Sequence, residues 1–189
     1  DPIWLEGQAV SMGQNLSYGP IKQILEADAG LCGAEDPDAR FAALQSRLGA
    51  LLPEDRDRLT PIASLLGLLP KPVAADPQTS GGEDRPGEPL QDALVRYFQA
   101  LSARRPLVLL FEDCHWIDAS SAALVERLLP LTTAAPLLLC LVARPEIENG
   151  LLAPDRVVAQ LPGRYEEIRL SPLNEEESHH LVAELLGSR

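Results

Sequence analysis

Cysteines, aromatic residues and basic residues are scarce in this sequence, and each scarcity argues against a class of protein. The 189 residues include three cysteines, 4% aromatic residues, and 16 lysines and arginines against 28 aspartates and glutamates. The cysteines are far apart and show no Cys-x-x-Cys spacing, which argues against a disulfide framework or a zinc site and favours a reducing cytoplasm. With so few aromatic side chains, the core has to be built from leucine, valine, isoleucine and alanine.

The net charge of −12 comes without any cluster of lysine or arginine. Binding to a nucleic-acid backbone needs clustered cations, so no direct nucleic-acid partner is expected. No apolar run approaches the ~20 residues that a membrane span requires. No basic leader with an apolar core opens the chain, so neither a membrane partner nor secretion is expected.

The first half of the chain reads as a strand at residues 3–5 followed by a helical insertion at residues 20–70. Three helices are predicted there, starting near Pro20, Pro37 and Pro53, because proline is well tolerated in a first helical turn. Their apolar faces consist of Ile21, Ile24 and Leu25, then Phe41, Leu44, Leu48 and Leu51, then Leu59, Ile62, Leu65, Leu66 and Leu69.

Residues 71–89 are rich in proline and glycine and poor in apolar side chains. Such a segment cannot bury enough surface to offset its ordering entropy, so a mobile surface loop is predicted.

Residues 90–189 alternate between helical and extended patterns. Helices are predicted at 90–103, at 120–129 and after Asn174, and strands at 106–111, 136–143 and 167–170. The first two strands are continuous apolar runs, as expected for parallel strands that are covered on both faces. The alternation indicates an α/β fold with a doubly wound parallel sheet.

Charged residues follow both apolar strands, at the sheet edge where open α/β proteins bind ligands. Glu112 and Asp113 end the first strand and Arg144 ends the second. One acid would hold Mg²⁺ and the other would orient an attacking water, although the sequence does not say which does which. Arg144 would reach the γ-phosphate of a nucleotide. Alternatively, the acids only solvate a strand end, and Arg144 forms a salt bridge with Glu146 or a nearby acid.

Two further residues near this strand end have two readings each. His115 could help to shape a nucleotide site or could be a packing element next to Trp116. Asp118 could hold a water near the metal or could cap the following helix. The adjacent His179 and His180 point about 100° apart on a helix and read as a solvated face rather than a metal site.

The run Leu107 to Asp118, with its core Glu-Asp-x-His-Trp-x-Asp, resembles the Walker B segment of a known group of ATPases. These are the AAA-type modules of the signal-transduction ATPases with numerous domains (STAND), which are fused to bacterial class III adenylate or guanylate cyclases and LuxR-type regulators. The segments 5–7 and 15–21 are similar to the second strand of that family and its helix, 142–146 to its sensor strand, and 170–174 to the start of its post-core helices.

The resemblance implies a P-loop-NTPase-like fold, three layers around a parallel sheet, with residues 1–189 forming a partial ATPase core. The family's Gly-x-x-x-x-Gly-Lys-[Ser/Thr] loop does not occur in the sequence. The core is therefore expected to be incomplete, without its first strand and phosphate loop. This chain alone is expected to bind ATP weakly or not at all, because that loop supplies the phosphate-binding backbone N–H groups and the lysine.

The resemblance implies that the parent protein binds Mg²⁺ and ATP and acts on an output domain of the same polypeptide, a cyclase or a DNA-binding domain. The predicted function is part of an ATP-binding and hydrolysing regulatory module. The alternative is a non-catalytic scaffold or interaction module that retains the ATPase fold. An exposed sheet edge could pair between copies and form a homo-oligomer. A generic dinucleotide enzyme is disfavoured because no Gly-x-Gly-x-x-Gly follows a strand.

Overall fold

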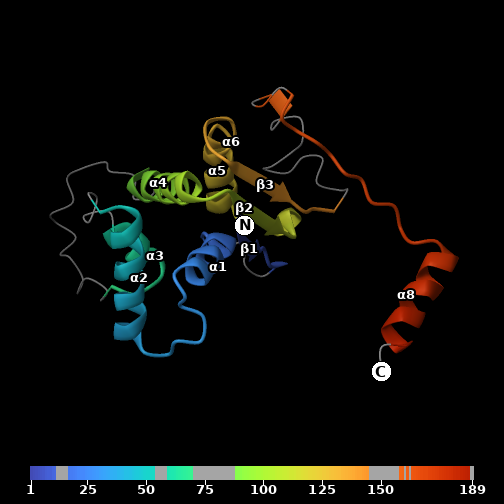
Figure 1. The fold of residues 1–189 in the computed structure, drawn as a ribbon, viewed down its shortest axis with the longest axis horizontal. Helices are drawn as coiled ribbons and strands as arrows, with labels where there is room; N and C mark the ends of the chain where they lie inside the picture. The colour runs from blue at the N-terminus through green and yellow to red at the C-terminus, as the bar shows by residue number, and fades with distance from the viewer. Residues whose placement is uncertain are drawn as a thin grey trace.

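The computed structural model describes residues 1–11, 17–53, 59–69, 88–144, 158, 159, 161 and 163–187. Its elements run along the chain in an alternating α/β order (Figure 1). They are β1 (Ile3–Gln8), α1 (Gly19–Asp28), α2 (Pro37–Leu51), α3 (Leu59–Leu65), α4 (Glu88–Arg104), β2 (Leu107–Glu112), α5 (Ala119–Leu128), α6 (Leu131–Ala134), β3 (Leu137–Leu141) and α8 (Glu175–Gly187).

The three strands form one parallel sheet in the order β1-β2-β3. Leu107 of β2 pairs with Ile3 on one side and with Leu137 on the other, so all three strands start in register. A sheet whose neighbours follow the chain order, joined by right-handed crossovers, places its connecting helices on one face. The expected parallel α/β fold is thus present as an incomplete sheet.

One face of the sheet lies in the core and the opposite face is open. Leu107, Leu109 and Phe111 of β2 are almost fully buried in a single cluster that also includes side chains of α1, α4 and α5. On the opposite face, Trp4 is 58% and Leu138 is 59% exposed. The expectation that the apolar strands are covered on both faces is therefore wrong for the described residues, which cover only one.

The two predicted helices after β1 are confirmed, and their apolar faces are buried as expected. Ile21, Ile24 and Leu25 of α1 are all 0% exposed. Helix α2 starts at Pro37, and the side chain of Asp36 accepts hydrogen bonds from the backbone N–H groups of the first turn. Both boundaries follow from local sequence chemistry.

Helix α3 is shorter than its leucine pattern predicts. Leu66 and Leu69 lie beyond its end, and Pro53, where the helix was expected to start, lies in a turn. Gly67 has φ +68°, and the N–H of Leu68 bonds to the carbonyl of Ala63 at 2.9 Å. This is a Schellman ending, in which glycine adopts the left-handed conformation that closes the helix.

A buried polar cluster ties α1, α2 and α4 together. Asp28 accepts two hydrogen bonds from the guanidinium of Arg47, at 2.7 and 2.8 Å, and a third from the hydroxyl of Tyr97. Burial is the largest cause that raises the pKa of Tyr97 above its usual range, and the hydrogen bond to Asp28 raises that of Arg47. The insertion helices are thereby fixed to the helix that precedes β2.

The carboxyl-terminal part differs from the prediction in one element. No strand forms at residues 167–170, where Ile168 and Leu170 are 78% and 87% exposed and no described strand lies alongside. A strand needs a pairing edge, which an apolar alternation of four residues does not supply. Helix α8 confirms the Asn174 cap, because Asn174 and Glu177 exchange two hydrogen bonds of 2.9 Å.

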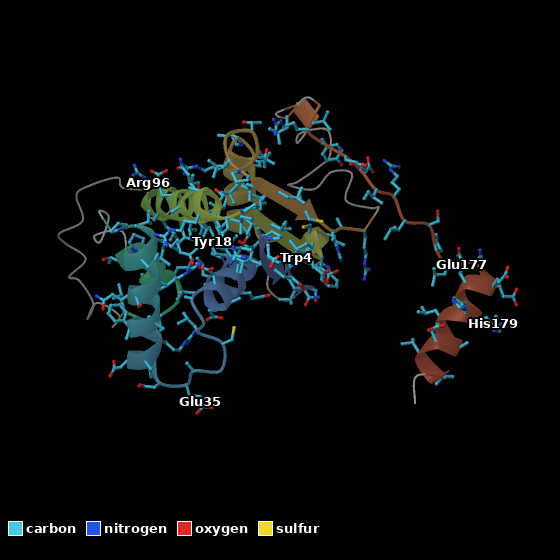
Figure 2. The ribbon with its side chains drawn as sticks, in the orientation of Figure 1. Trp4, Tyr18, Glu35, Arg96, Glu177 and His179 are labelled. Carbon is cyan, nitrogen blue, oxygen red and sulfur yellow. The ribbon has the colours of Figure 1, made fainter. Side chains whose placement is uncertain are left out.

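In Figure 1, helix α8 lies apart from the sheet and the other helices. His179, which is labelled on α8 in Figure 2, is exposed, and so is His180, as expected for a solvated face. The predicted loop at 71–89 lies outside the described residues up to position 87, and α4 begins at Glu88. Among the described residues, no helix is both long and apolar enough to cross a membrane.

Candidate functional site

The carboxyl ends of the three strands are joined by backbone hydrogen bonds that continue past the regular ladder. The N–H of Ala9 bonds to the carbonyl of Glu112 at 3.0 Å. On the other side, the N–H of Val142 bonds to Phe111 and the carbonyl of Val142 accepts from Cys114, both at 2.8 Å. The segments that follow β2 and β3 are therefore held side by side, which brings the predicted acids and the predicted cation to one edge of the sheet.

The two predicted acids have different surroundings. Glu112 is the last residue of β2, and its half-buried side chain makes no hydrogen bond or ion pair with the described part of the chain. Asp113 leaves the strand with φ +53°, a left-handed conformation that non-glycine residues rarely adopt. Its Oδ2 atom accepts a hydrogen bond of 2.9 Å from Nε2 of Gln8, at the end of β1. Among the described residues, the carboxylate of Glu112 is therefore unengaged, whereas one oxygen of Asp113 is already bonded to Gln8.

Gln8 was not among the residues that the sequence pointed to. Its own backbone is held by the side chain of Gln23 on α1, which accepts from the N–H of Gln8 at 3.0 Å and donates to its carbonyl at 2.9 Å. The amide that reaches Asp113 therefore extends from a fixed backbone. No sequence motif identifies Gln8, because only the pairing of β1 with β2 brings it beside residue 113.

Arg144 lies against an aromatic ring at the same edge. Its guanidinium carbon is 5.4 Å from the centre of the Trp116 ring, and Trp116 in turn contacts the ring of His115, with 4.3 Å between centroids. A guanidinium at this distance from an indole is attracted by the negative face of the ring. Arg144 makes no hydrogen bond or ion pair with Glu112 or Asp113 in the described structure, and its alternative partner Glu146 lies outside the described residues.

The side chain of His115 mainly makes packing contacts, although both nitrogens of its ring are buried. Neither of its two ring nitrogens has a hydrogen-bond partner in the described part of the chain, and Nδ1 is 3.9 Å from Oδ1 of Asp113. The ring packs against Trp116, as the packing alternative predicts. A direct role of His115 toward a nucleotide stays a prediction.

Asp118 is a structural residue, which confirms its capping alternative. The side chain caps α5 by accepting from the N–H of Ser121 at 2.9 Å and from its hydroxyl at 2.6 Å. The same carboxylate accepts from the N–H groups of Tyr18 and Gly19, where α1 begins, at 3.0 and 3.2 Å. Asp118 is only 5% exposed. Because its carboxylate already accepts four hydrogen bonds, it has little capacity left to hold a water near a metal.

The carboxylates of Glu112 and Asp113 are oxygen ligands of the kind that Mg²⁺ takes. Mg²⁺ takes oxygen ligands and is usually held by one or two carboxylates together with waters and substrate phosphates. Glu112 offers a carboxylate that has no partner among the described residues, and the charge of Asp113 lies next to it in sequence. Within the described ranges, no group of three or more His, Cys, Asp and Glu residues could hold a metal by itself.

The model of one protein family, the AAA ATPase domain, matches residues 1–142. The match includes the sheet, helices α1 to α6, Glu112, Asp113, His115 and Asp118, and it ends two residues before Arg144. No curated protein and no solved structure matches the chain at a significant level. The parallel sheet, the acids at the tip of β2 and the family match agree, and the chain belongs to the AAA ATPase domain family.

Proposed function

We propose that the chain is part of an ATP-binding and hydrolysing regulatory module of a cytoplasmic signalling protein. The observation that supports this most directly is the juxtaposition at the carboxyl edge of the sheet. Glu112 and Asp113 lie at the end of β2 and Arg144 follows β3, on backbone segments that the hydrogen bonds of Val142 hold side by side. Opposite charges at one edge of a parallel sheet suit a metal-bound triphosphate.

In this proposal the two acids have separate roles. Glu112 is the magnesium ligand, since its carboxylate has no other partner among the described residues. Asp113 orients the attacking water, since the hydrogen bond from Gln8 fixes one of its oxygens and leaves the other free to accept. When bound, Mg²⁺ neutralises charge that develops on the phosphates.

Three further residues support the site. Arg144 reaches the γ-phosphate as a cation with a planar set of donors. His115 contributes by fixing the indole of Trp116, against which it packs. Asp118 contributes indirectly, by holding α1 and α5 together beneath the strand ends.

The regulatory context is proposed from the resemblance of the Glu-Asp-x-His-Trp-x-Asp segment. In modules of this kind, hydrolysis switches a conformation that gates an output domain, here a cyclase or a DNA-binding domain of the same polypeptide. The alternative is a scaffold that keeps the fold without catalysis. A Gly-x-x-x-x-Gly-Lys-[Ser/Thr] motif in the sequence encoded upstream of Asp1 would support the ATPase, whereas a degenerate loop there would support the scaffold.

The test is nucleotide binding and turnover by the chain extended with the sequence encoded upstream of Asp1. We expect Mg-ATP binding by the parent, loss of magnesium-dependent binding in Glu112→Gln, and loss of turnover with binding retained in Asp113→Asn. Glu6→Gln is the matched control, because Glu6 is an exposed acid in the middle of β1. Unchanged binding and turnover in both acid variants would contradict the site, whereas parent binding without turnover would favour the scaffold.

A further inference from the structure

The contact between Arg144 and Trp116 has no role in the site as described so far. Arg144 is exposed and follows β3 by three residues, and its guanidinium rests over the indole rather than on either acid. An exposed arginine loses side-chain entropy when it is held in one place, so a specific contact has to compensate for that loss. The attraction between the guanidinium and the indole supplies such a contact.

The backbone on both sides of this contact is anchored. Val142, two residues before Arg144, is hydrogen-bonded through its N–H to Phe111 and through its carbonyl to Cys114, two residues before Trp116. Trp116 itself lies in a 3₁₀ turn, with its N–H bonded to the carbonyl of Asp113 at 2.8 Å and its ring against His115. The guanidinium can therefore leave the indole by rotation of its own side-chain torsions, without moving a strand.

We infer that Trp116 is a positioning residue that holds Arg144 in a resting place, from which the γ-phosphate of a bound nucleoside triphosphate draws it. The inference rests on the proposed function, since it assigns a resting partner to the arginine proposed to read the γ-phosphate. The indole and the phosphate compete for one cation. Because a ligand shifts such an equilibrium only by its differential affinity for the two states, a diphosphate leaves Arg144 on the indole.

The strength of the resting contact sets the size of the effect. A cation–π pair at an exposed site is worth about 0.5–1 kcal/mol, which corresponds to about a twofold to fivefold change in affinity. Removing the indole should therefore tighten triphosphate binding about twofold to fivefold and leave diphosphate binding unchanged. A merely structural role of Trp116 would weaken both nucleotides alike.

The first experiment needs no nucleotide. Trp4 and Trp116 are the two tryptophans of the chain, so a Trp4→Phe background leaves Trp116 as the only indole emitter. In that background, Arg144→Gln should shift the emission of Trp116 and increase its quenching by acrylamide. Arg105→Gln is the matched control, because Arg105 precedes β2 at the opposite end of the sheet and binds the carbonyl of Asp1. Equal emission and quenching in both arginine variants would overturn the resting contact.

The second experiment titrates Mg-ATP and Mg-ADP into the chain extended upstream of Asp1, in the same background. We expect ATP and not ADP to change the emission of Trp116. Trp116→Leu, whose binding is followed by calorimetry because the reporting indole is removed, should bind ATP more tightly and ADP unchanged. Trp116→Phe keeps an aromatic face, so its affinity for ATP should lie between that of the parent and that of Trp116→Leu. It also serves as a control for misfolding of the leucine variant. ATP binding that leaves the emission unchanged overturns the inference alone. Failure of the parent to bind ATP overturns the proposed function and the inference with it.

Discussion

The carboxylate of Asp118 accepts a hydrogen bond of 3.0 Å from the backbone N–H of Tyr18, a residue 100 positions earlier in the chain. Tyr18 adopts a left-handed conformation with φ 62° and provides no side-chain cap for α1. Asp118 therefore serves the amino-terminal ends of both α1 and α5, where backbone N–H groups are unpaired and negative charge is favoured. The last acid of the Walker B-like segment is thus a clamp between two helices.

Asp118→Ala should destabilise the fold strongly. The substitution leaves backbone donors of both helices without a partner in a buried position, and we expect a loss of about 2–4 kcal/mol. Urea unfolding followed by circular dichroism measures it. Asp36→Ala is the matched control, because Asp36 caps α2 at an exposed position and has no long-range partner in the described part of the chain. The loss in this variant should be about 1 kcal/mol. Equal losses in the two variants would contradict the clamp.

Tyr97→Phe should destabilise the chain by about 1–3 kcal/mol, because it removes one hydrogen bond to the buried carboxylate of Asp28. The side chain of Asp28 is only 4% exposed, so water cannot replace the lost donor. Thermal unfolding or urea unfolding would measure the difference.

The surface pair between Arg40 and Glu26 provides the comparison, since both side chains are partly exposed. Arg40→Ala should cost about 0–1 kcal/mol. A Tyr97→Phe variant as stable as the parent would show that the cluster does not stabilise the packing of α1 against α4.

Gly7→Ala should be destabilising although glycine is normally unfavourable in a strand. A Cβ atom at position 7 would lie 2.4 Å from the carbonyl oxygen of Pro20, so α1 could not stay as close to β1 as it is. Overpacking of this kind costs about 1–3 kcal/mol. Gly49→Ala in α2 should instead stabilise by about 0.5–1 kcal/mol, because nothing lies within 4 Å of its Cβ position. If the unfolding midpoints of Gly7→Ala and Gly49→Ala moved in the same direction, the close approach of α1 to β1 at Gly7 would be contradicted.

Stability should fall in alkaline solution because of Cys114. Burial is the main cause that raises the pKa of this thiol from 9.0 to about 12. A group whose pKa is higher in the folded state stabilises the fold fully below its unfolded pKa, and this contribution is lost as the pH rises from about 9 toward 12. The contribution of Cys114 at pH 10 should be about 1–1.5 kcal/mol lower than at pH 7.

Urea unfolding at pH 7, 9 and 10 measures this loss. Cys114→Ala should flatten the profile between pH 9 and pH 10 relative to the parent chain. Cys32→Ala should leave the profile unchanged, because Cys32 is exposed. If the stability of Cys114→Ala changed with pH in parallel with that of the parent chain, the thiol would ionise as easily in the folded as in the unfolded chain.

The sequence was most informative where local chemistry decides the structure. The helix starts at Pro20, Asp36 and Asn174 follow from proline and capping side chains, and the strands around residues 109 and 139 follow from apolar runs. The sequence was misleading where the structure depends on contacts between residues that are far apart in the chain. The described residues cover the apolar runs of β2 and β3 on one face only, and they offer residues 167–170 no strand edge to pair with.

The candidate site divides in the same way. Glu112, Asp113 and Arg144 were identifiable because charged residues follow apolar strands. The hydrogen bond from Gln8 to Asp113 spans 105 positions, and the resting of Arg144 on Trp116 depends on how two turns meet. Neither relationship has a periodicity or spacing that a sequence could reveal.

The pairing of β1 with β2 has a consequence for synthesis of the chain. Ile3 pairs with Leu107, so the first strand leaves the ribosome long before its neighbour exists. At about 5–20 residues per second, the wait lasts roughly 5 to 20 s. During that interval β1 cannot yet pair with β2. Until then, the nascent chain depends on its early helices or on a chaperone to keep Trp4 and Leu5 from non-native contacts.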